Sequence, residues 1–435
     1  MSLSTLAEQP LLGCLDVETV ARLLMGMPVD ARLRAREVSR GWRALLNEPR
    51  FWLVLDFSRG SGVVARVSLA LLFAAGERGR GHLHTLDLTG VRRVDDDDLV
   101  EFVAAHGESL RSVTAPEELK FSADQVTRLC RSAPLCTLRC YVKCEPDEAL
   151  PLLRCEAPYA LVHIFNLCVD GFNDSEQVVL DFAAALPSHS GKIKTLIVNM
   201  TQLENVAVAD ALMRGVAEAH VNDVTFHNCH LVPPSLPGLT RLLQAGCLET
   251  LSINNNWQAL FEEGPALTAF CHALCSSTLQ KLELNMCELW RDPAAAGELL
   301  AALVGHQTLR EFSMRYSGVD HTDDARRAAG ERFASLITHN SALQKIDSQD
   351  CSLGEAGLAP IFEALPRAST LKELNFSYER ISRKFARDVI LPAVRANTSL
   401  RKLDFGPYRV LPELVEALAI VAARMQRDDG AIAAA

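Results

Sequence analysis

The side chains best suited to chemistry in this sequence are thiols and imidazoles. The stretch from His227 to His230 holds two histidines and Cys229, which are zinc-ligand types. A closed zinc site needs four ligands, and Cys229 has a more natural place as a small buried residue of a repeat. Three cysteines recur every four residues between positions 136 and 144, but the middle one falls on an expected strand, so they would not share a helical face. We expect no metal site and no cofactor.

The cysteine content indicates a compartment rather than a reaction. The thirteen cysteines are an odd number, include no Cys-x-x-Cys pair and mostly lie beside apolar residues, as reduced thiols of an intracellular protein do. The first sixteen residues lack the basic start and apolar block of a signal peptide. We therefore expect the cytoplasm, the nucleus or both.

Motifs for catalysis are missing from the sequence. Gly-x-Ser-x-Gly, His-Glu-x-x-His and a persuasive Cys/His nucleophile setting do not occur. The glycine-rich segment 76–81 lacks the Gly-Lys-Ser/Thr ending of a phosphate loop, and we predict a mobile link there. The acidic run Asp95–Asp98 precedes an apolar stretch and is expected to cap a helix. We expect no enzymatic activity.

Composition and charge favour a folded protein with protein partners. The chain has 435 residues, of which 49% are hydrophobic and 23% are charged, so it can bury a large core. Its formal net charge is −10, which gives no overall attraction to a phosphate backbone or an anionic membrane. We expect neither nucleic acid nor membrane as a partner.

One apolar spacing, Leu-x-x-Leu-x-Leu with similar residues, organises most of the chain. The twelve copies begin at Leu83, Leu110, Leu135, Val162, Ile193, Val221, Leu248, Leu279, Leu309, Leu343, Leu371 and Leu400. Each copy predicts a short strand with alternate residues in the core, and amphipathic helices are predicted over 294–306, 357–368 and 385–397. Such units must stack to bury their apolar sides.

The period is typical of leucine-rich repeats, and the chain resembles those of the ribonuclease-inhibitor-like class. This predicts an α/β solenoid, a horseshoe with a parallel sheet inside and helices outside, over residues 83–426. A capping helix is expected over 412–426 and a disordered tail over 427–435.

A second regularity supports the repeat. The residue eight places after the first leucine is expected to satisfy buried backbone groups or to pack as a small thiol beneath the turn that follows the strand. These residues are Cys229, Asn256, Cys287 and Cys351, with Thr201 and Ser317 as polar substitutes. A structural role is therefore favoured over a redox or metal role for these thiols.

The first 58 residues lack the repeat, and apolar residues at helical spacing predict three short helices there. So small a unit cannot bury all its large apolar groups, which should seek a partner. The block Val38–Arg43 and the pair Phe51-Trp52 resemble an F-box, the module that docks a receptor onto the Skp-type adaptor of a cullin-based ubiquitin ligase. The resemblance implies adaptor contacts from Leu15, Val20, Leu23, Leu24, Met27, Val38, Trp42, Leu45, Phe51 and Trp52. The alternative is a helical cap on the first repeat. Residues 59–82 are expected to form a linker and the lead-in to the first repeat.

Strand positions two, four and six after each first leucine should face a target. The first row reads Lys281, Glu311, Lys345, Glu373 and Lys402, and its alternating signs predict a cross-strand charge ladder. The second row reads Glu283, Ser313, Asp347, Asn375 and Asp404. The hypothesis is that this acidic strip, edged by Arg315 and Gln349, takes a basic or hydroxyl-rich segment of a target protein. The alternative is a merely solvated face.

Together these patterns predict the substrate-recognition subunit of a Skp-cullin-F-box-type ubiquitin ligase. Its partners would be a Skp-type adaptor with its cullin complex and an unidentified target protein, whose lysines it holds near a charged ubiquitin carrier. The alternatives are a leucine-rich-repeat scaffold, an inhibitor or a GTPase-activating protein, each without a ligase link.

Overall fold

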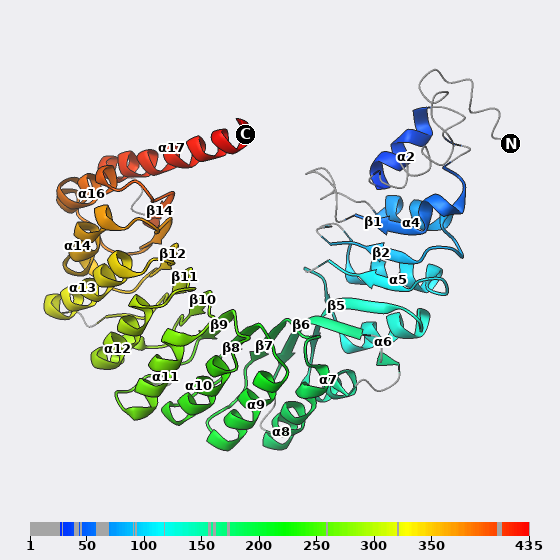
Figure 1. The fold of residues 1–435 in the computed structure, drawn as a ribbon, viewed down its shortest axis with the longest axis horizontal. Coiled ribbons are helices and arrows are strands. Elements are labelled where there is room, and N and C mark those ends of the chain that lie inside the picture. Colours follow the sequence, from blue (N-terminus) through cyan, green and yellow to red (C-terminus); the bar gives the residue numbers. More distant parts are fainter. Residues whose placement is uncertain are drawn as a thin grey trace. The chain divides into compact units, whose positions relative to one another are not determined.

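The chain forms two compact units in the computed structural model (Figure 1). The structure describes residues 27, 29–38, 43, 46–57, 69–89, 91, 94–116, 118–154, 158–159, 162–171, 175–257, 260–319, 322–406 and 411–434. Unit 1 comprises Met1–Cys168 with Lys192–Lys194, and unit 2 comprises Val169–Gly191 with Thr195–Ala435. No helix in the described ranges combines the length and apolar character that crossing a bilayer requires.

Unit 1 begins with helical turns and continues as strand–helix repeats. Its elements are α2 (Val29–Val38), the 3-10 turn η2 (Pro49–Trp52), β1 (Val54–Asp56), α4 (Leu69–Arg78), β2 (Thr85–Asp87), α5 (Asp96–His106), β3 (Ser112–Thr114), β4 (Lys120–Phe121), α6 (Ala123–Ser132), β5 (Thr137–Cys144), α7 (Pro146–Leu153) and β6 (Val162–Asp170). Its strands pair in the order β1-β2-β3-β5-β6, with β4 beside β5. The β1-β2, β2-β3, β3-β5 and β4-β5 pairs are parallel.

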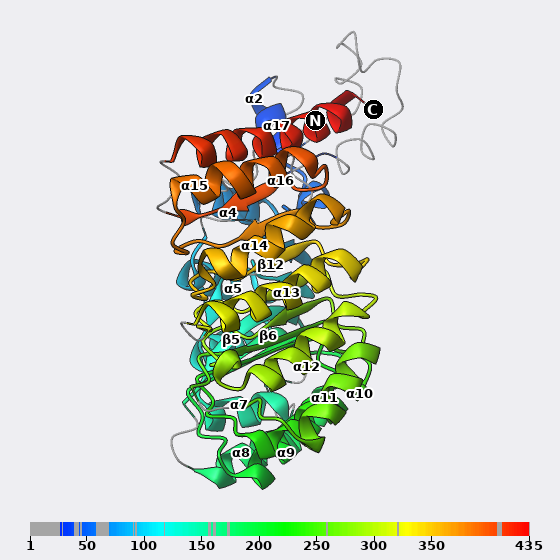
Figure 2. The same ribbon diagram turned by 90° about the vertical axis from the view of Figure 1, so that its left-hand side faces the viewer.

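Unit 2 repeats the same plan. Its elements are α8 (Glu176–Ala185), η5 (Leu186–His189), β7 (Thr195–Asn199), α9 (Val206–Glu218), β8 (Asp223–His227), η6 (Pro233–Ser235), α10 (Leu236–Gln244), β9 (Thr250–Asn254), α11 (Pro265–Ser276), β10 (Lys281–Glu283), η7 (Leu289–Arg291), α12 (Pro293–Val304), β11 (Glu311–Ser313), α13 (Asp323–His339), β12 (Lys345–Asp347), α14 (Gly354–Ala364), η8 (Leu365–Arg367), β13 (Glu373–Asn375), α15 (Arg383–Phe385), the π-helical turn η9 (Ala386–Ile390), α16 (Leu391–Ala396), β14 (Lys402–Asp404) and α17 (Pro412–Ala434). Strands β7 to β14 pair in chain order, and the helices stack along one side of them (Figure 2).

The predicted repeat is confirmed, and the chain has the fold of a leucine-rich-repeat solenoid. Each of the twelve predicted copies contains a described strand. In unit 2 the middle apolar residues align across neighbouring strands, as in the register of Leu251, Leu282, Phe312 and Ile346, and all four are buried. Alternation along each strand therefore places one side chain in two in a continuous core.

The register of the third copy is wrong by one residue at its start. Leu135 is 61% exposed, whereas Cys136, Leu138 and Cys140 are buried. Leu138 does align with Val113 of the preceding strand, so only the first position of the copy is misplaced. The small side chain of Cys136 thus occupies the core position that was expected for Leu135.

The predicted ladder residues lie where the repeat requires them. The Cys287 and Cys351 thiols donate hydrogen bonds to the carbonyls of Ile253 (2.9 Å) and Met314 (3.0 Å) in the preceding repeat. Asn256 is buried and bridges both backbone groups of Leu231, accepting at 2.6 Å and donating at 2.9 Å. Cys229, Ser317 and Thr201 are also buried and donate to backbone carbonyls. These residues satisfy backbone groups that turns leave inside the core.

Two segments differ from the mobile or linking character expected of them. Residues 76–78 end helix α4, inside the segment 59–82 expected as linker and repeat lead-in, and a Cβ at Gly79 would lie 2.8 Å from the Trp52 carbonyl oxygen. The glycines of 76–81 thus include one required by close packing, rather than forming a mobile link. The tail expected to be disordered continues helix α17 as far as Ala434.

The acidic run caps its helix as predicted. The Asp95 side chain accepts from the Asp98 amide at 2.7 Å, and the Asp98 side chain accepts from the Asp95 amide at 3.4 Å. This reciprocal arrangement begins α5 and places carboxylates at the positive end of its dipole.

Candidate protein-binding surfaces

Most residues of the predicted adaptor surface lie outside the described residues. Leu15, Val20, Leu23, Leu24, Trp42 and Leu45 belong to this group, as does the side chain of Val38. Met27 is described and half-buried.

Phe51 and Trp52 are buried in unit 1, with exposed fractions of 1% and 0%. The Trp52 indole nitrogen donates to the Leu46 carbonyl at 2.6 Å. The guanidinium groups of Arg32 and Arg78 lie over its ring, 5.5 and 5.7 Å from the centroid. Our placement of Phe51 and Trp52 on an adaptor surface is therefore wrong, because neither side chain is accessible.

Trp52 instead opens a repeat that the sequence analysis missed. Strand β1 pairs with β2 so that Leu55 aligns with Leu86. Trp52, Leu55 and Phe57 thus hold the three apolar positions of a further copy, 31 residues before Leu83, and all three are buried. The spacing was present in the sequence, but two aromatic residues replaced its leucines. The solenoid therefore begins inside the predicted 1–58 module, before residue 83.

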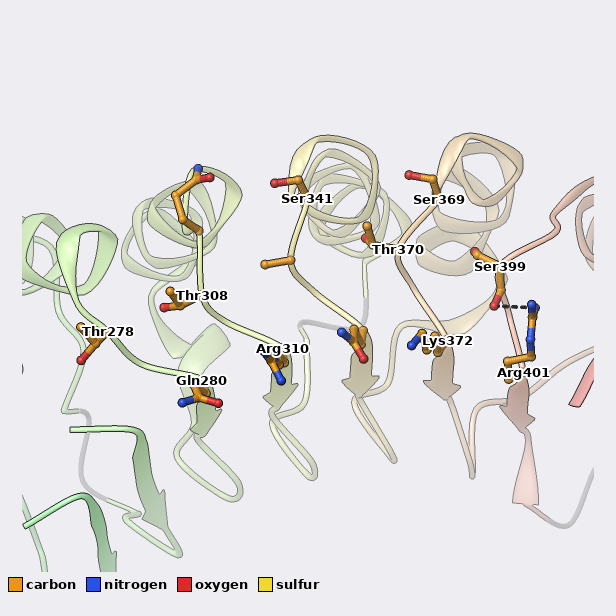
Figure 3. A pocket seen from close by; sticks show the side chains of 13 residues that line it. Thr278, Gln280, Thr308, Arg310, Ser341, Ser369, Thr370, Lys372, Ser399 and Arg401 are labelled. Carbon is orange, nitrogen blue, oxygen red and sulfur yellow. Dashed lines mark hydrogen bonds between the residues drawn. The ribbon is translucent and has the colours of Figure 1, made fainter. Parts of the chain in front are cut away.

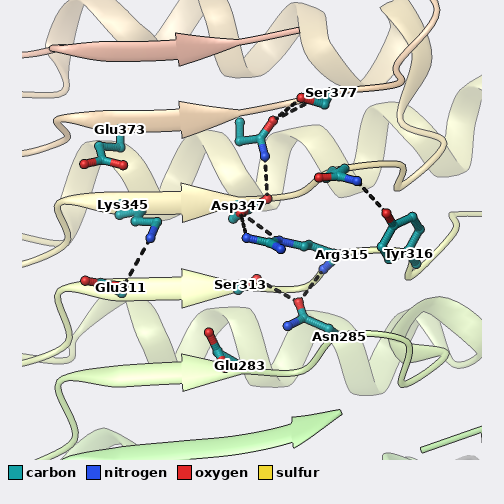
Figure 4. A network of polar contacts seen from close by, with 12 residues as sticks. Glu283, Asn285, Glu311, Ser313, Arg315, Tyr316, Lys345, Asp347, Glu373 and Ser377 are labelled. Carbon is teal, nitrogen blue, oxygen red and sulfur yellow. Dashed lines mark hydrogen bonds and ion pairs between the residues drawn. The ribbon is translucent and has the colours of Figure 1, made fainter. Parts of the chain in front are cut away.

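The first charged row of unit 2 forms part of the predicted ladder (Figure 4). The Lys345 ammonium lies 3.4 Å from the Glu311 carboxylate, and that of Lys402 lies 3.6 Å from Glu373. Lys281 differs, because it pairs at 2.8 Å with Glu283 of its own strand rather than with Glu311. Each lysine of the row consequently has a glutamate partner within unit 2, and that of Lys281 belongs to the second row.

The second row is also satisfied internally, which corrects the acidic-strip hypothesis. Asp347 is only 3% exposed, and its Oδ2 accepts from the guanidinium of Arg315, with the Nε bond at 2.8 Å. Its Oδ1 accepts from the Asn375 amide at 2.9 Å. Hydrogen bonding to Asp347 raises the pKa of Arg315 above its ordinary value. Both oxygens of Asp347 thus already have donors within unit 2, and the residue is buried away from a basic ligand.

The remaining members of the strip also have partners within unit 2. Glu283 accepts from the Ser252 hydroxyl at 2.7 Å, and although burial acts to raise its pKa, the bonds from Lys281 and Ser252 bring that pKa below the ordinary value. Asp404 accepts from the Gly406 amide at 2.7 Å. At the edge of the strip the Gln349 amide donates to the Tyr316 hydroxyl at 2.5 Å (Figure 4). The predicted target-binding residues are thus brought together, but as a network that joins repeats.

A row of left-handed residues follows the strands of unit 2, which we call the strand-end row. It occupies the position seven residues after each first apolar residue and consists of Met200, Asn228, Asn255, Met286, Tyr316, Asp350 and Tyr378. Their φ angles run from 50° to 71°. Asparagine and aspartate accept this conformation readily, whereas methionine and tyrosine do so at a cost. Met200, Tyr316 and Tyr378 are nevertheless 59%, 40% and 56% exposed.

The opposite edge, where the strands begin, holds a groove of about 710 Å³ that the sequence analysis also missed (Figure 3). Its lining consists of Thr278, Gln280, Gln307, Thr308, Arg310, Ser341, Ala342, Gln344, Ser369, Thr370, Lys372, Ser399 and Arg401. Three of these side chains are cationic and none is acidic. We call it the basic groove.

Buried anchors shape the turns that form this groove. The Asn340 side chain accepts from the amides of Ala342 and Leu343 at 2.8 Å each and donates to two carbonyls of the preceding repeat. Asn397 makes the corresponding bonds two repeats later. His306 is also fully buried, and its Nδ1 accepts from the amides of Thr308 (3.3 Å) and Leu309 (3.1 Å). Each anchor lies three residues before a first leucine.

The thiols of the described residues suit structure better than reaction. Eleven cysteines are described, none of them in a disulfide bond, and most are buried. Burial raises the pKa of Cys229, Cys271 and Cys287 to about 12, so they carry no thiolate near neutral pH. The described part of the chain holds no group of three or more His, Cys, Asp or Glu residues placed to bind a metal.

Comparisons with known proteins assign the chain to no family. No protein-family model matches the chain, and no curated protein sequence matches it. Among solved structures, the yeast Rad7 and Elc1 complex matches at 12% identity with a TM-score of 0.44, covering 96% of this chain and 90% of that one. The leucine-rich-repeat-containing protein LegL7 from Legionella pneumophila matches at 11% identity with a TM-score of 0.40, covering 74% and 94%.

A third solved structure, leiomodin-1 actin-binding site 2, matches at 19% identity with a TM-score of 0.27, covering 31% of this chain and 74% of that one. All three TM-scores are below 0.5, so no activity or partner is carried over from these proteins. By its own strands, helices and period, the chain has the fold of a leucine-rich-repeat protein.

Proposed function

We propose that this chain is a non-catalytic protein-binding subunit, the substrate receptor of a Skp-cullin-F-box-type ubiquitin ligase, which holds its target protein on unit 2. Catalysis of ubiquitin transfer belongs to other subunits in this proposal. The receptor contributes by keeping target lysines close to the charged ubiquitin carrier. The buried, protonated thiols support a non-catalytic role, and the absence of disulfide bonds among the described cysteines supports an intracellular location.

The observation that carries target binding is the strand-end row. A left-handed backbone costs a bulky side chain on the order of 1 kcal/mol, yet Met200, Tyr316 and Tyr378 stand in that conformation and face solvent. Trp257, two residues after the row, is also 55% exposed. Strain at exposed positions is typical of sites retained for function, and exposed aromatic residues are typical of interface centres.

Target binding can be tested with Tyr316→Asn and Tyr378→Asn in one full-length chain. Asparagine fits the left-handed backbone, so the variant should be as stable as the parent chain while losing targets that the parent captures from cells. Val415→Asn is the matched control, because Val415 is 51% exposed on α17 of the same unit. Equal capture by all three chains would exclude the strand-end row as the target surface.

The ligase link is supported by sequence resemblance in the block Val38–Arg43 and by the order of an F-box-like segment followed by repeats. Deleting residues 1–58 is a poor test, because it would remove Trp52 and strand β1 from the core of unit 1. We therefore favour Leu23→Asp with Leu24→Asp, two of the predicted adaptor contacts that lie outside the described residues.

Co-purification of the full-length variant with a Skp-type adaptor tests the link directly. Leu135→Asp is the control, because Leu135 is the most exposed large apolar residue described in unit 1. We expect adaptor recovery to fall for the double variant and to persist for the control. Recovery from neither the parent chain nor the control would leave a repeat protein without a ligase link.

A further inference from the structure

The basic groove differs in charge from the rest of the chain. Arg310, Lys372 and Arg401 line it without an acidic neighbour in the lining, although the whole chain carries a net charge of −10. On the adjacent strand face, every lysine of the first row is paired with a glutamate. The groove therefore gathers positive charge that no acidic side chain of its lining neutralises.

Two of the three cationic side chains of the groove are exposed and can contact a ligand, and the third is held in a fixed orientation. Arg310 and Lys372 are exposed, and neither side chain makes a hydrogen bond or ion pair with a residue that the structure describes. Arg401 is held in place, because its Nη1 donates to the carbonyls of Thr398 and Ser399 at 2.8 Å each. Holding this guanidinium in advance lowers the entropy cost of binding an anion.

Donor groups recur along the groove with the spacing of the strands. Five consecutive repeats present Gln280, Arg310, Gln344, Lys372 and Arg401 immediately before their strands (Figure 3). Parallel strands lie about 4.8 Å apart, so the five donors extend over about 19 Å, the length of about six extended residues. Each of these side chains can donate hydrogen bonds, and none is a carboxylate.

Four of the six hydroxyl groups that line the groove donate to backbone carbonyls. Thr308 donates to the Leu279 carbonyl at 2.8 Å, and Ser399 donates to the Ala368 carbonyl at 2.8 Å. These hydroxyls join neighbouring repeats, and this structural role accounts for their recurrence from repeat to repeat. The binding chemistry of the groove consequently rests on its cations and amides.

We propose that the basic groove binds an extended acidic segment of a partner protein. Its carboxylates pair with Arg310, Lys372 and Arg401, while the Gln280 and Gln344 amides donate to its backbone carbonyls. A peptide fits better than nucleic acid, because the lining offers no aromatic side chain on which a base could stack. The inference rests on the proposed function only in taking unit 2 as a protein-binding unit, and it requires no ligase adaptor.

The test measures binding of a fluorescein-labelled ten-residue peptide rich in glutamate to the full-length chain by fluorescence anisotropy. A glutamine-rich peptide of equal length is the neutral probe. Arg310→Glu with Lys372→Glu should weaken binding of the acidic peptide at least about tenfold, because two attractive contacts become repulsive. Arg310→Lys with Lys372→Arg should bind within about threefold of the parent, since both charges remain.

Arg327→Glu with Lys384→Glu is the matched control. Both residues are exposed on helices of unit 2 outside the groove, and the change in net charge is the same. We expect the control to bind as the parent does and binding by the parent to weaken as salt is added. If both charge-reversed chains lost the same affinity for the acidic peptide, the change in net charge alone would account for the loss and the proposal would be overturned.

Two further outcomes would also overturn it. The neutral peptide could bind as tightly as the acidic one, or single-stranded DNA of the same charge could bind more tightly than the peptide. The proposed function fails separately: loss of targets on changing Tyr316 and Tyr378, without any binding of the acidic peptide, would retain target binding on unit 2 and remove only the acidic-segment proposal.

Discussion

The strand face and the basic groove of unit 2 are built from neighbouring positions of the same repeats, yet they treat charge differently. On the face, Glu311 and Glu373 pair with lysines of the next strand, and Asp347 is enclosed by Arg315 and Asn375. In the groove, uncharged anchors such as Asn340 hold the backbone, and no acidic side chain stands among the cations of the lining. The charged side chains of the strand face thus hold neighbouring repeats together, whereas those of the basic groove are available for binding.

Asn340→Ala should cause the largest loss of stability, because it removes an uncharged anchor of the groove. Two amides and two carbonyls would lose their buried partner. We expect the free energy of unfolding to fall by about 3 kcal/mol, measured by chemical denaturation. A loss below about 0.5 kcal/mol would show that water replaces the side chain and that the groove needs no such anchor.

Asp347→Ala should be the most damaging change on the strand face. It leaves Arg315 and Asn375 without their shared acceptor at a site where the aspartate is 3% exposed. We expect a loss of about 2 kcal/mol, moderated because the Arg315 side chain is 44% exposed and can be solvated. If the parent chain bound a basic peptide more tightly than this variant does, the acidic strip would be a binding site after all.

The groove should respond to acid through His306. Burial lowers the pKa of His306 below its ordinary value of 6.5, and its Nδ1 must be unprotonated to accept from the amides of Thr308 and Leu309. The unfolded chain takes up a proton first, so stability is fully present above pH 6.5 and falls as the pH drops below it.

His306→Asn provides the test, because asparagine occupies the corresponding anchor position at Asn340 and Asn397. The variant should lose less stability than the parent chain between pH 7 and pH 5, measured by thermal unfolding. Some dependence should remain, since burial also lowers the pKa of His106 in unit 1. Parallel pH profiles for the two chains would contradict the role of His306.

The Glu373–Lys402 pair should show the smallest effect. Its side chains are 41% and 66% exposed, so water screens their attraction. A double-mutant cycle with alanine at both positions should give a coupling of about 0.5 kcal/mol or less, decreasing with salt. A coupling above about 1 kcal/mol would mean that the ladder stabilises the sheet more than its exposure implies.

The repeat could be predicted because it follows from local spacing, whereas partner choice could not. Leu282 and Leu284 face the core because alternate residues of a strand point to the same side, whatever surrounds it. The sequence did not show whether Lys281 would form an ion pair with Glu283 or with Glu311. The folded structure shows that it pairs with Glu283. The repeat that begins at Trp52 was missed because Trp52 and Phe57 replace leucines. The first position of the copy assigned to Leu135 was misplaced because Cys136 rather than Leu135 is buried.

The sequence by itself determined the repeat, its period and the ladder residues such as Cys287 and Cys351. The repeat and its ladder residues depend on spacings within one short strand and turn, and the period depends on the recurrence of those spacings along the chain. Only the tertiary structure decided that Phe51 and Trp52 are buried, that Asp347 is enclosed and that Arg310 and Lys372 share a groove. These outcomes depend on side chains that folding brings together from different repeats, and no spacing along the chain fixes which of them will meet.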